Sequence, residues 1–217
     1  RRYKPDPIPD GYVEKIIEAA RWSMSGANGQ PWEFIIIKDQ ETKKKIAELH
    51  LRSRAEQYYI EQTRVEGLRH NNMLAPHDKL PGYIGAPVLI IVCGDRRAFQ
   101  ASILSGVFLG SGGTLDGTYQ KSIANATYGL QLAAAALGLG SQWATVTTEL
   151  EQWLKPVLGI PAVLQIHSIV PVGYSNFEPK PAYRRKPEEF VHYEKYDMSK
   201  YRTGEQIVED IRKLRKK

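Results

Sequence analysis

The sequence has few of the residues on which disulfides and metal sites depend. It contains one cysteine, Cys93, and 5 histidines among 217 residues. A single cysteine excludes an intramolecular disulfide, and the histidines form no Cys/His pattern typical of a bound metal. Cys93 lies inside an apolar run, where a lone thiol behaves as a small buried hydrophobe. We therefore expect no metal and a chain suited to a reducing cytoplasm.

Long apolar runs are also absent. No segment approaches the roughly 18 consecutive apolar residues of a membrane-spanning helix, and the first residues lack the apolar stretch of a signal peptide. These absences predict a soluble, cytoplasmic protein with no membrane partner.

Hydrolase and phosphate-loop motifs are missing as well. The sequence has no Gly-x-Ser-x-Gly nucleophile elbow, so hydrolysis is not favoured. The glycine-rich segment Leu109–Gly117 lacks the Lys-Ser/Thr order of a phosphate loop and the spacing of a dinucleotide fingerprint. We expect this segment to form a flexible loop.

The sequence does have a modest excess of positive charge. Its 30 Lys and Arg against 24 Asp and Glu give a net charge of +6, which favours anionic partners. Five of the positive charges lie in residues 212–217, a run expected to form a solvated tail. No nucleic-acid-binding motif accompanies the charge, so we expect no nucleic-acid partner.

Hydrophobic periodicity predicts a single α+β domain over residues 1–217, of which 42% are hydrophobic. Apolar residues at i, i+3, i+4 and i+7 after Asp10 indicate an N-capped helix that ends near Trp22. The other predicted helices are 41–59, 122–139 and 149–158. The predicted strands are 32–37, 88–92, 142–146 and 164–172.

Two segments break this periodicity. Residues 60–85 are polar and are expected to form a surface segment or a mobile lid. Residues 176–217 are rich in charge and, as far as Met198, in proline. This composition predicts an extended C-terminal arm and tail.

The predicted helix Ser122–Leu139 carries small apolar residues on several faces. A helix of this composition is expected to be buried nearly all round, in a core or in a contact between subunits. It therefore favours a homodimer.

A polar loop, which contains Ser25, Asn28 and Gln30, lies between the first predicted helix and the first predicted strand. Taken alone, these three side chains fit turn formation as well as ligand binding.

Two segments at the start of the chain, Arg1–Pro9 and Ala19–Trp32, resemble the opening of the nitroreductase family. Four further segments match the family's motifs in the same order: Leu137–Trp143, Leu158–Pro161, Pro171–Tyr174 and Arg184–Pro187. The resemblance covers nearly the whole chain. It implies an α+β fold with a mixed, mainly antiparallel sheet flanked by helices, in an intertwined homodimer that binds two FMN molecules at its interface.

The resemblance also implies which cations contact FMN. Arg1, beside Arg2, matches a basic residue that approaches the flavin. Arg185, beside Arg184, matches a C-terminal arginine that reaches the phosphate, and a guanidinium group can bind phosphate through two parallel hydrogen bonds. The alternative for Arg185 is a solvated surface charge.

The polar loop after the first helix is the second part of the implied FMN site. Ser25 and Asn28 match positions that contact the flavin across the dimer. Gly26 belongs to the same loop, and Met24 stands where many relatives have proline. All four residues are assigned to the cofactor site.

The segment Thr-Val-Thr-Thr at residues 145–148 resembles the iodotyrosine deiodinase branch of the family. In that branch the hydroxyls of this stretch lie near flavin N5. Thr145, Val146, Thr147 and Thr148 are therefore assigned to the cofactor site.

The acceptor site is expected in residues 54–85. The deiodinase branch holds its halotyrosine zwitterion with a glutamate, a tyrosine and a lysine. Tyr58 fits the tyrosine, but Arg54 stands where the glutamate should be, and Leu80 near the lysine position. Arg54 and Tyr58 are assigned to the substrate, and halotyrosines rank below nitroaromatics and quinones. The alternative is that Tyr58 and Tyr59 pack their helix against the sheet.

Together these features predict an enzyme in which NADH or NADPH reduces FMN, and the flavin reduces a small aromatic acceptor such as a nitroaromatic or a quinone. No side chain is assigned as a catalytic acid or base. The alternatives are a reductive dehalogenase of halogenated tyrosine or phenol, and a flavin- or anion-binding protein without turnover.

Overall fold

The computed structural model describes residues 2–65, 79–98, 114–178 and 183–215. The chain divides into two compact units, Arg1–Glu178 and Pro179–Lys217, and each is described by itself. The single domain expected over residues 1–217 stays a prediction.

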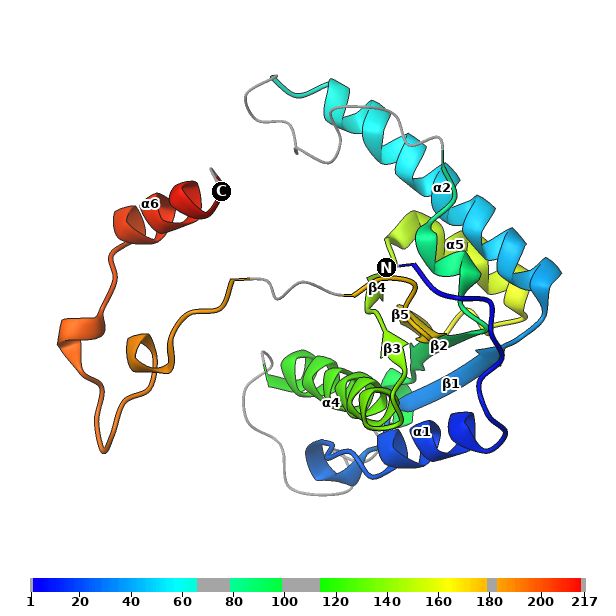
Figure 1. Cartoon of the computed structure of the whole chain (residues 1–217), viewed down its shortest axis with the longest axis horizontal. Coiled ribbons are helices and arrows are strands. Elements are labelled where there is room, and N and C mark those ends of the chain that lie inside the picture. Colours follow the sequence, from blue (N-terminus) through cyan, green and yellow to red (C-terminus); the bar gives the residue numbers. More distant parts are fainter. Residues whose placement is uncertain (1, 66–78, 99–113, 179–182, 216–217) are drawn as a thin grey trace. The chain divides into compact units, whose positions relative to one another are not determined.

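A five-stranded sheet forms the centre of the first unit (Figure 1). Its strands are β1 (Trp32–Ile37), β2 (Val88–Gly94), β3 (Gly140–Ser141), β4 (Ala144–Thr145) and β5 (Gln165–Gly173). Their order is β1-β2-β5-β3, with β4 also paired to β5, and every pairing among the described strands is antiparallel. The predicted α+β class is confirmed, whereas the single strand expected at 142–146 is replaced by β3 and β4.

The central strands follow from their composition. Every residue of β2 is buried, and β5 is buried from Ser168 to Gly173. Continuous runs of Val, Ile and Leu are typical of strands that are covered on both faces. In contrast, β1 at the edge of the sheet exposes Glu33 and Ile36 and buries Trp32 and Ile37.

Helices cover both faces of the sheet. One face carries α1 (Tyr12–Arg21) and α4 (Thr114–Ala136), and the other carries α2 (Gln40–Gln62) and α5 (Thr148–Leu158). The cluster under α1 and α4 includes Ile16, Ile123, Leu130, Ile90 and Val170. The cluster under α2 and α5 includes Ile46, Leu150, Leu154, Leu89 and Ile169.

The close approach of α1 and α4 depends on Gly129. A Cβ added there would lie 2.8 Å from the Oγ of Ser23 and 3.6 Å from the carbonyl oxygen of Ala19. Glycine therefore lets the turn that follows α1 rest directly against α4.

The helix starts follow the expected chemistry at α2 but not at α1. The carboxylate of Asp39 caps α2, because it accepts the backbone N–H of Thr42 at 2.7 Å. α1 instead begins after Gly11, whose φ of 78° lies in the left-handed region, and no side chain caps it. The prediction that Asp10 caps this helix is wrong, because the chain turns at glycine one residue later.

The glycine-rich segment is partly helical, which corrects the expectation of a loop. α4 begins at Thr114, while residues 109–113 lie outside the described part of the chain. Tyr119 and Ile123, one turn apart, are each 1% exposed. Burial of this helix face outweighs the low helix propensity of Gly117.

One face of α4 is exposed, so the helix is not buried all round within one chain. Tyr128 and Leu132, one helical turn apart, are 59% and 52% exposed. The sequence predicts this helix in a core or in a contact between subunits. The core of a single chain buries only the face opposite Tyr128 and Leu132.

The segment expected as a surface or lid begins and ends in ordered structure. α2 continues to Gln62, and Tyr83 is buried, with its hydroxyl 3.0 Å from Nδ1 of His50. Residues 66–78 lie outside the described part. A lid over 60–85 stays a prediction.

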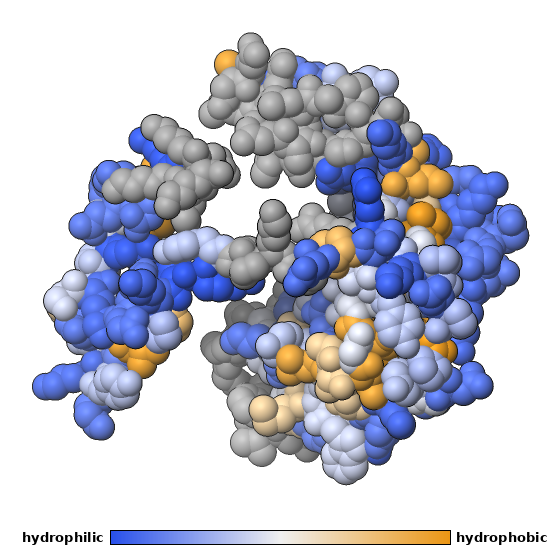
Figure 2. Space-filling model, in the orientation of Figure 1, coloured by the Kyte–Doolittle hydropathy of each residue, from blue (hydrophilic) through white to orange (hydrophobic). Residues whose placement is uncertain are grey.

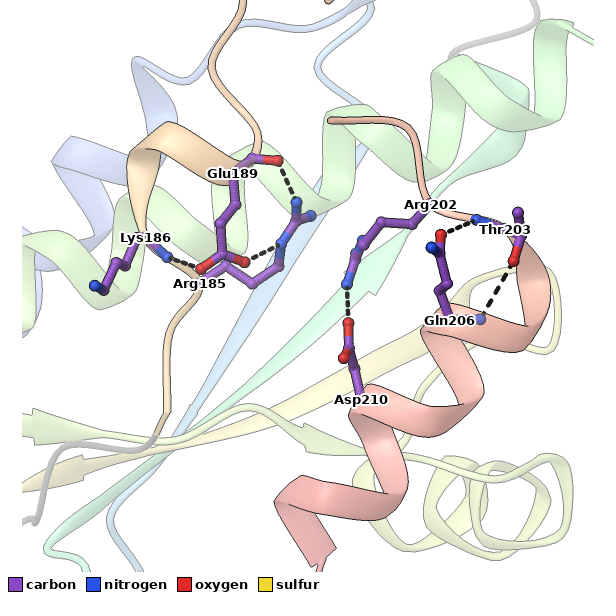
Figure 3. A network of polar contacts seen from close by, with 7 residues as sticks. All are labelled: Arg185, Lys186, Glu189, Arg202, Thr203, Gln206 and Asp210. Carbon is purple, nitrogen blue, oxygen red and sulfur yellow. Dashed lines mark hydrogen bonds and ion pairs between the residues drawn. The ribbon is translucent and has the colours of Figure 1, made fainter. Parts of the chain in front are cut away.

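The second unit ends in a helix that the sequence analysis did not expect. α6 (Gly204–Arg215) follows two short 3-10 turns, at Pro187–Glu189 and Met198–Lys200. The hydroxyl of Thr203 accepts the Gln206 N–H at 3.3 Å, and the Gln206 side chain accepts the Thr203 N–H at 2.9 Å (Figure 3). This reciprocal cap starts the helix, so the tail is not simply extended.

None of the described helices is long and apolar enough to cross a membrane.

Buried tyrosine hydroxyls and a buried cysteine thiol predict that the first unit loses stability at alkaline pH. Burial raises the pKa of Tyr3, Tyr119 and Cys93 to about 12, from ordinary values of 10.0 for tyrosine and 9.0 for cysteine. The unfolded chain releases these protons first. Their contribution to stability is therefore full below the ordinary values and is lost as pH rises toward 12.

Urea unfolding at several pH values measures this effect. The urea midpoint should fall between about pH 9 and 11, and Tyr119→Phe should make the fall shallower. Tyr128→Phe changes an exposed tyrosine of the same helix and is the matched control. A midpoint that does not change over this range would contradict the prediction.

Candidate functional site

The loop after α1 has an unusual backbone. Ala27, Asn28 and Gln30 have φ values of 50°, 52° and 43°, in the left-handed region. A residue other than glycine costs on the order of 1–2 kcal/mol in this region. Such strain is common in loops that bind ligands, and it persists only where the surroundings hold it.

Hydrogen bonds to α4 hold this loop. The backbone N–H of Gly26 donates to the Oγ of Ser122 at 3.2 Å. The side-chain amide of Asn125 donates to the carbonyl of Met24 at 3.2 Å, and the hydroxyl of Ser23 donates to the carbonyl of Asn125 at 3.3 Å. The loop is therefore fixed from the α4 side.

The four predicted cofactor residues of this loop differ in exposure. Met24 is 82% exposed and Asn28 is exposed, while Ser25 and Gly26 are half-buried. Ser25 Oγ accepts the N–H of Gln30 at 3.0 Å, so it does form a turn, as one alternative held. That bond uses a lone pair and not the hydroxyl hydrogen, so turn formation does not exclude ligand binding.

The second predicted segment, residues 145–148, joins β4 to α5. Thr145 pairs with Ser168 of β5 and is exposed, Val146 is half-buried, and Thr148 is exposed at the first position of α5. Thr147 is the N-cap of α5. Two of the three hydroxyl-bearing side chains therefore face solvent, and the third supports a helix.

The hydroxyl of Thr147 makes two hydrogen bonds. Its Oγ1 accepts the backbone N–H of Leu150 at 3.3 Å and lies 3.1 Å from the Oγ of Ser53 on α2. Sequence reasoning missed Ser53, because these serine and threonine residues are 94 positions apart and no local pattern connects them.

Two buried oxygens next to this segment lack a partner. Among the described residues, Gln142 Oε1 and Ser168 Oγ are buried side-chain atoms with no hydrogen bond. Gln142 precedes β4, and Ser168 is the strand partner of Thr145. Unsatisfied buried polar atoms are rare in proteins, and a bound group or an ordered water would satisfy them. The exposed hydroxyls of Thr145 and Thr148 fit a polar ligand such as the predicted flavin, whereas the two buried oxygens have almost no accessible surface and fit an ordered water.

The predicted acceptor residues lie on the C-terminal half of α2. Arg54 and Tyr58 are one helical turn apart and both are half-buried. Burial lowers the pKa of the Arg54 guanidinium, which stays charged at neutral pH. Tyr59 is 69% exposed and lies edge-on to Tyr58, with ring centroids 5.6 Å apart. Packing against the sheet therefore does not account for Tyr59.

Three of the four arginines that are predicted to contact FMN are either exposed or outside the described residues. Arg1 lies outside the described residues, and Arg2 is exposed, with its carbonyl accepting the Asn176 N–H at 3.0 Å. Arg184 is exposed and donates to the carbonyl of Tyr183 at 2.9 Å.

Arg185, in the second unit, pairs with Glu189 (Figure 3). Its Nε lies 3.3 Å from Glu189 Oε2, and its Nη2 donates to the Glu189 carbonyl. The guanidinium also lies 5.4 Å from the centroid of the Phe190 ring. Arg185 is therefore a partly exposed cation that is paired with a carboxylate, and its contact with the FMN phosphate stays a prediction.

A cavity of about 570 Å³ in the second unit is lined by three cations, Arg185, Lys200 and Arg202. Its lining also includes four carboxylates, Glu188, Glu189, Glu209 and Asp210, and Arg202 pairs with Asp210 at 3.1 Å. Because the four carboxylates outnumber the three cations, this cavity alone is poorly suited to a phosphate.

Ser122 and Asn125 are the supporting residues of the loop that sequence reasoning missed. They lie three positions apart near the start of the predicted helix 122–139. Their polar side chains, three positions apart on one side of the helix, were the available signal, and Ser122 is buried, where a polar side chain usually has a partner.

Comparison with known proteins identifies the family. The Nitroreductase family model matches residues 1–174. A Thermus thermophilus protein named NADH dehydrogenase is 28% identical over 197 residues, covering 88% of this chain and 89% of its own length. Iodotyrosine deiodinase of Thermotoga neapolitana is 27% identical over 193 residues, covering 89% and 91%.

A solved structure agrees with the sequence comparisons. The crystal structure of oxidised iodotyrosine deiodinase bound to FMN and 3-iodo-L-tyrosine has a TM-score of 0.65 and 26% identity, covering 90% of this chain and 94% of that chain. The family model spans most of the first unit. The chain therefore belongs to the nitroreductase family, and its predicted fold and its class as a flavin oxidoreductase are confirmed.

Proposed function

We propose that the chain transfers electrons from NADH or NADPH, through bound FMN, to a small aromatic acceptor such as a nitroaromatic or a quinone. The observation that carries this proposal is the strained loop of residues 25–30, which α4 holds in place with Asn28 exposed, in a chain of this family. A relative with 26% identity binds FMN, and another is named NADH dehydrogenase, which supports the cofactor and the donor.

FMN, when bound, supplies the hydride and single-electron chemistry. The residues of the chain bind and orient it. Exposed Thr145, Thr148 and Asn28 offer hydrogen bonds to the ring, and the arginines near both ends of the chain offer positive charge to the phosphate. No described side chain needs to act as a proton donor.

The absorption spectrum of the purified protein tests the cofactor, and steady-state oxidation of NADH and NADPH tests turnover. We expect a yellow protein with an FMN spectrum that consumes reductant when a nitroaromatic or a quinone is added. FMN binding without turnover would favour the alternative of a non-catalytic flavin-binding protein. A colourless protein that does not take up FMN would refute the proposal.

The active unit is proposed to be a homodimer. Four apolar residues around the contact of α1 and α4 are exposed: Trp22 by 73%, Met24 by 82%, Tyr128 by 59% and Leu132 by 52%. Figure 2 shows an apolar area over α4. An exposed apolar patch of this kind is typical of a protein–protein contact. We call it the α1–α4 apolar surface.

A charge placed in this surface should dissociate the dimer. We expect Leu132→Glu to sediment as a monomer at micromolar concentration, because an unpaired carboxylate is costly to bury. Val157→Glu is the matched control, since Val157 is a 43% exposed apolar residue of α5 on the other side of the sheet. A wild-type monomer that retains FMN would contradict the dimer and the assignment of Ser25 and Asn28 to a shared site.

Arg185 is proposed to bind the FMN phosphate. Arg185→Ala should weaken FMN binding by on the order of 1.5–3 kcal/mol, the scale of a hydrogen bond to a charged group. Riboflavin binding should not change, because riboflavin lacks the phosphate. Flavin fluorescence measures both dissociation constants.

Arg202→Ala is the matched control for this variant. The side chains of Arg202 and Arg185 are 32% and 33% exposed, and each is paired with a carboxylate of its own unit. We expect Arg202→Ala to leave FMN binding close to wild type. If both variants weaken FMN binding equally, or if Arg185→Ala also weakens riboflavin binding, Arg185 does not bind the phosphate specifically.

The acceptor is proposed to meet Arg54 and Tyr58 on α2. A cation at position 54 favours an acceptor with a negative charge, such as a nitrophenolate, over a zwitterion held through its ammonium group. The relatives that are named iodotyrosine deiodinases keep the halotyrosine alternative open.

Loss of the Arg54 charge should lower activity with a negatively charged acceptor more than activity with a neutral one. Arg54→Ala should lower kcat/KM for a nitrophenolate about tenfold and change that for a neutral quinone little. Arg52→Ala removes a cation from the same helix, where Arg52 lies 4.2 Å from the Trp153 ring centroid, and should spare both acceptors. A wild-type preference for halotyrosine would reverse the ranking of acceptors.

A further inference from the structure

The N-terminal part of α2, up to Ser53, is more deeply buried than the residues that follow it. The fully buried residues of α2 are Lys43, Ile46, Ala47 and Ser53, so full burial ends at Ser53 and the residues beyond it are half-buried or exposed. The remaining nine residues, 54–62, span roughly 13 Å at 1.5 Å per residue. Tyr59 and Ile60 in this half are 69% and 62% exposed. Figure 1 shows this end of α2 extending beyond the sheet and α5. We call residues 54–62 the projecting half of α2.

Ser53 lies at the end of the more deeply buried part of α2. It is 3% exposed, and its Oγ is 3.1 Å from Thr147 Oγ1, with either atom able to donate. Next to it, the guanidinium of Arg52 packs on the ring of Trp153. These two contacts hold α2 against α5 directly before the projecting half begins.

The hydroxyl of Thr147 can form only a limited set of hydrogen bonds with Leu150, Ser53 and a ligand at the same time. A hydroxyl has one hydrogen to donate and two lone pairs to accept. One lone pair of Thr147 accepts the N–H of Leu150. If Thr147 donates its hydrogen to a ligand, Ser53 must donate to the remaining lone pair; if a ligand donates to Thr147, Thr147 donates to Ser53. The direction of one hydrogen bond therefore fixes the other.

We propose that Ser53 is a positioning residue that couples the projecting half of α2 to residues 145–148 through the hydroxyl of Thr147. This inference rests on the proposed function, in which residues 145–148 hold FMN and the projecting half carries Arg54 and Tyr58. Energetic coupling between two sites is reciprocal. In this proposal, FMN that hydrogen-bonds to Thr147 fixes the direction of the Ser53–Thr147 bond and thereby orders the projecting half, and an acceptor bound there tightens FMN binding in return.

Hydrogen exchange of peptides within 54–62, with and without FMN, tests this coupling without measuring activity. In the wild type, FMN should slow exchange there about fivefold, the scale of one hydrogen bond. Ser53→Ala should still bind FMN but lose this protection, and Ser53→Thr, which keeps the hydroxyl, should restore it. Alanine favours the helix, and far-UV circular dichroism checks that the variant is folded.

Arg52→Ala is the matched control. It loosens the same contact between α2 and α5 one residue away, and it also removes the 3.3 Å pair of Arg52 with Glu56, but it leaves the pair of hydroxyls intact. We expect it to keep the FMN-dependent protection. Equal loss of protection in Arg52→Ala and Ser53→Ala would overturn the inference in favour of general packing.

Two further outcomes separate this inference from the proposed function. A wild type that binds FMN without protection of 54–62, or a Ser53→Ala variant that keeps full protection, would overturn the coupling and leave the proposed function standing. A wild type that does not bind FMN would refute the proposed function and the coupling together.

Discussion

The complete burial of β2 is the constraint on which the rest of the first unit depends. Each residue from Val88 to Gly94 is buried, so both faces of the sheet must be covered. Two helix pairs do this, and each contributes one apolar cluster. Because most of the interior is apolar on both sides, most polar residues of the candidate site lie in the loops and helix ends that border the sheet. The two candidate loops, before β1 and before α5, are such borders.

The same helices that close the core also fix these loops. α4 buries Ile123 and Leu130 and, on the side facing the turn after α1, presents Ser122 and Asn125 to the loop of residues 25–30. The strain of three left-handed residues is thereby offset by hydrogen bonds to a rigid element. α5 likewise fixes residues 145–148, because Thr147 is both a residue of the candidate site and the N-cap of this helix. Core packing and site geometry are therefore not independent in this chain.

The sequence was informative where local chemistry decides the structure. β1, β2 and β5 were predicted because runs of β-branched residues have few other solutions, and α2 and α5 were predicted as helices that follow or separate these strands. The start of α4 was wrong because packing of Tyr119 and Ile123 outweighed nearby glycines. α6 was not expected although Thr203 and Gln206 have the spacing of a capping box, because the high charge of residues 176–217 predicts an extended arm and tail. The candidate loops were found through family motifs, whereas the pair of Ser53 and Thr147 depends on tertiary contact and has no local signal.

The pairing of Arg185 with Glu189 bears on how a cation near the end of the chain could serve a phosphate. A guanidinium group has five N–H donors in a rigid plane, and Glu189 uses only the Nε side and one Nη2 hydrogen. The negative charge of Glu189 weakens the attraction for a second anion, but it also restricts a side chain that carries about 2 kcal/mol of rotamer entropy when free. A phosphate approaching the other edge would meet an arginine already held in one orientation, so less entropy would be lost on binding. On this argument Glu189 is compatible with phosphate binding by Arg185, because the carboxylate and the phosphate would use different edges of the same plane.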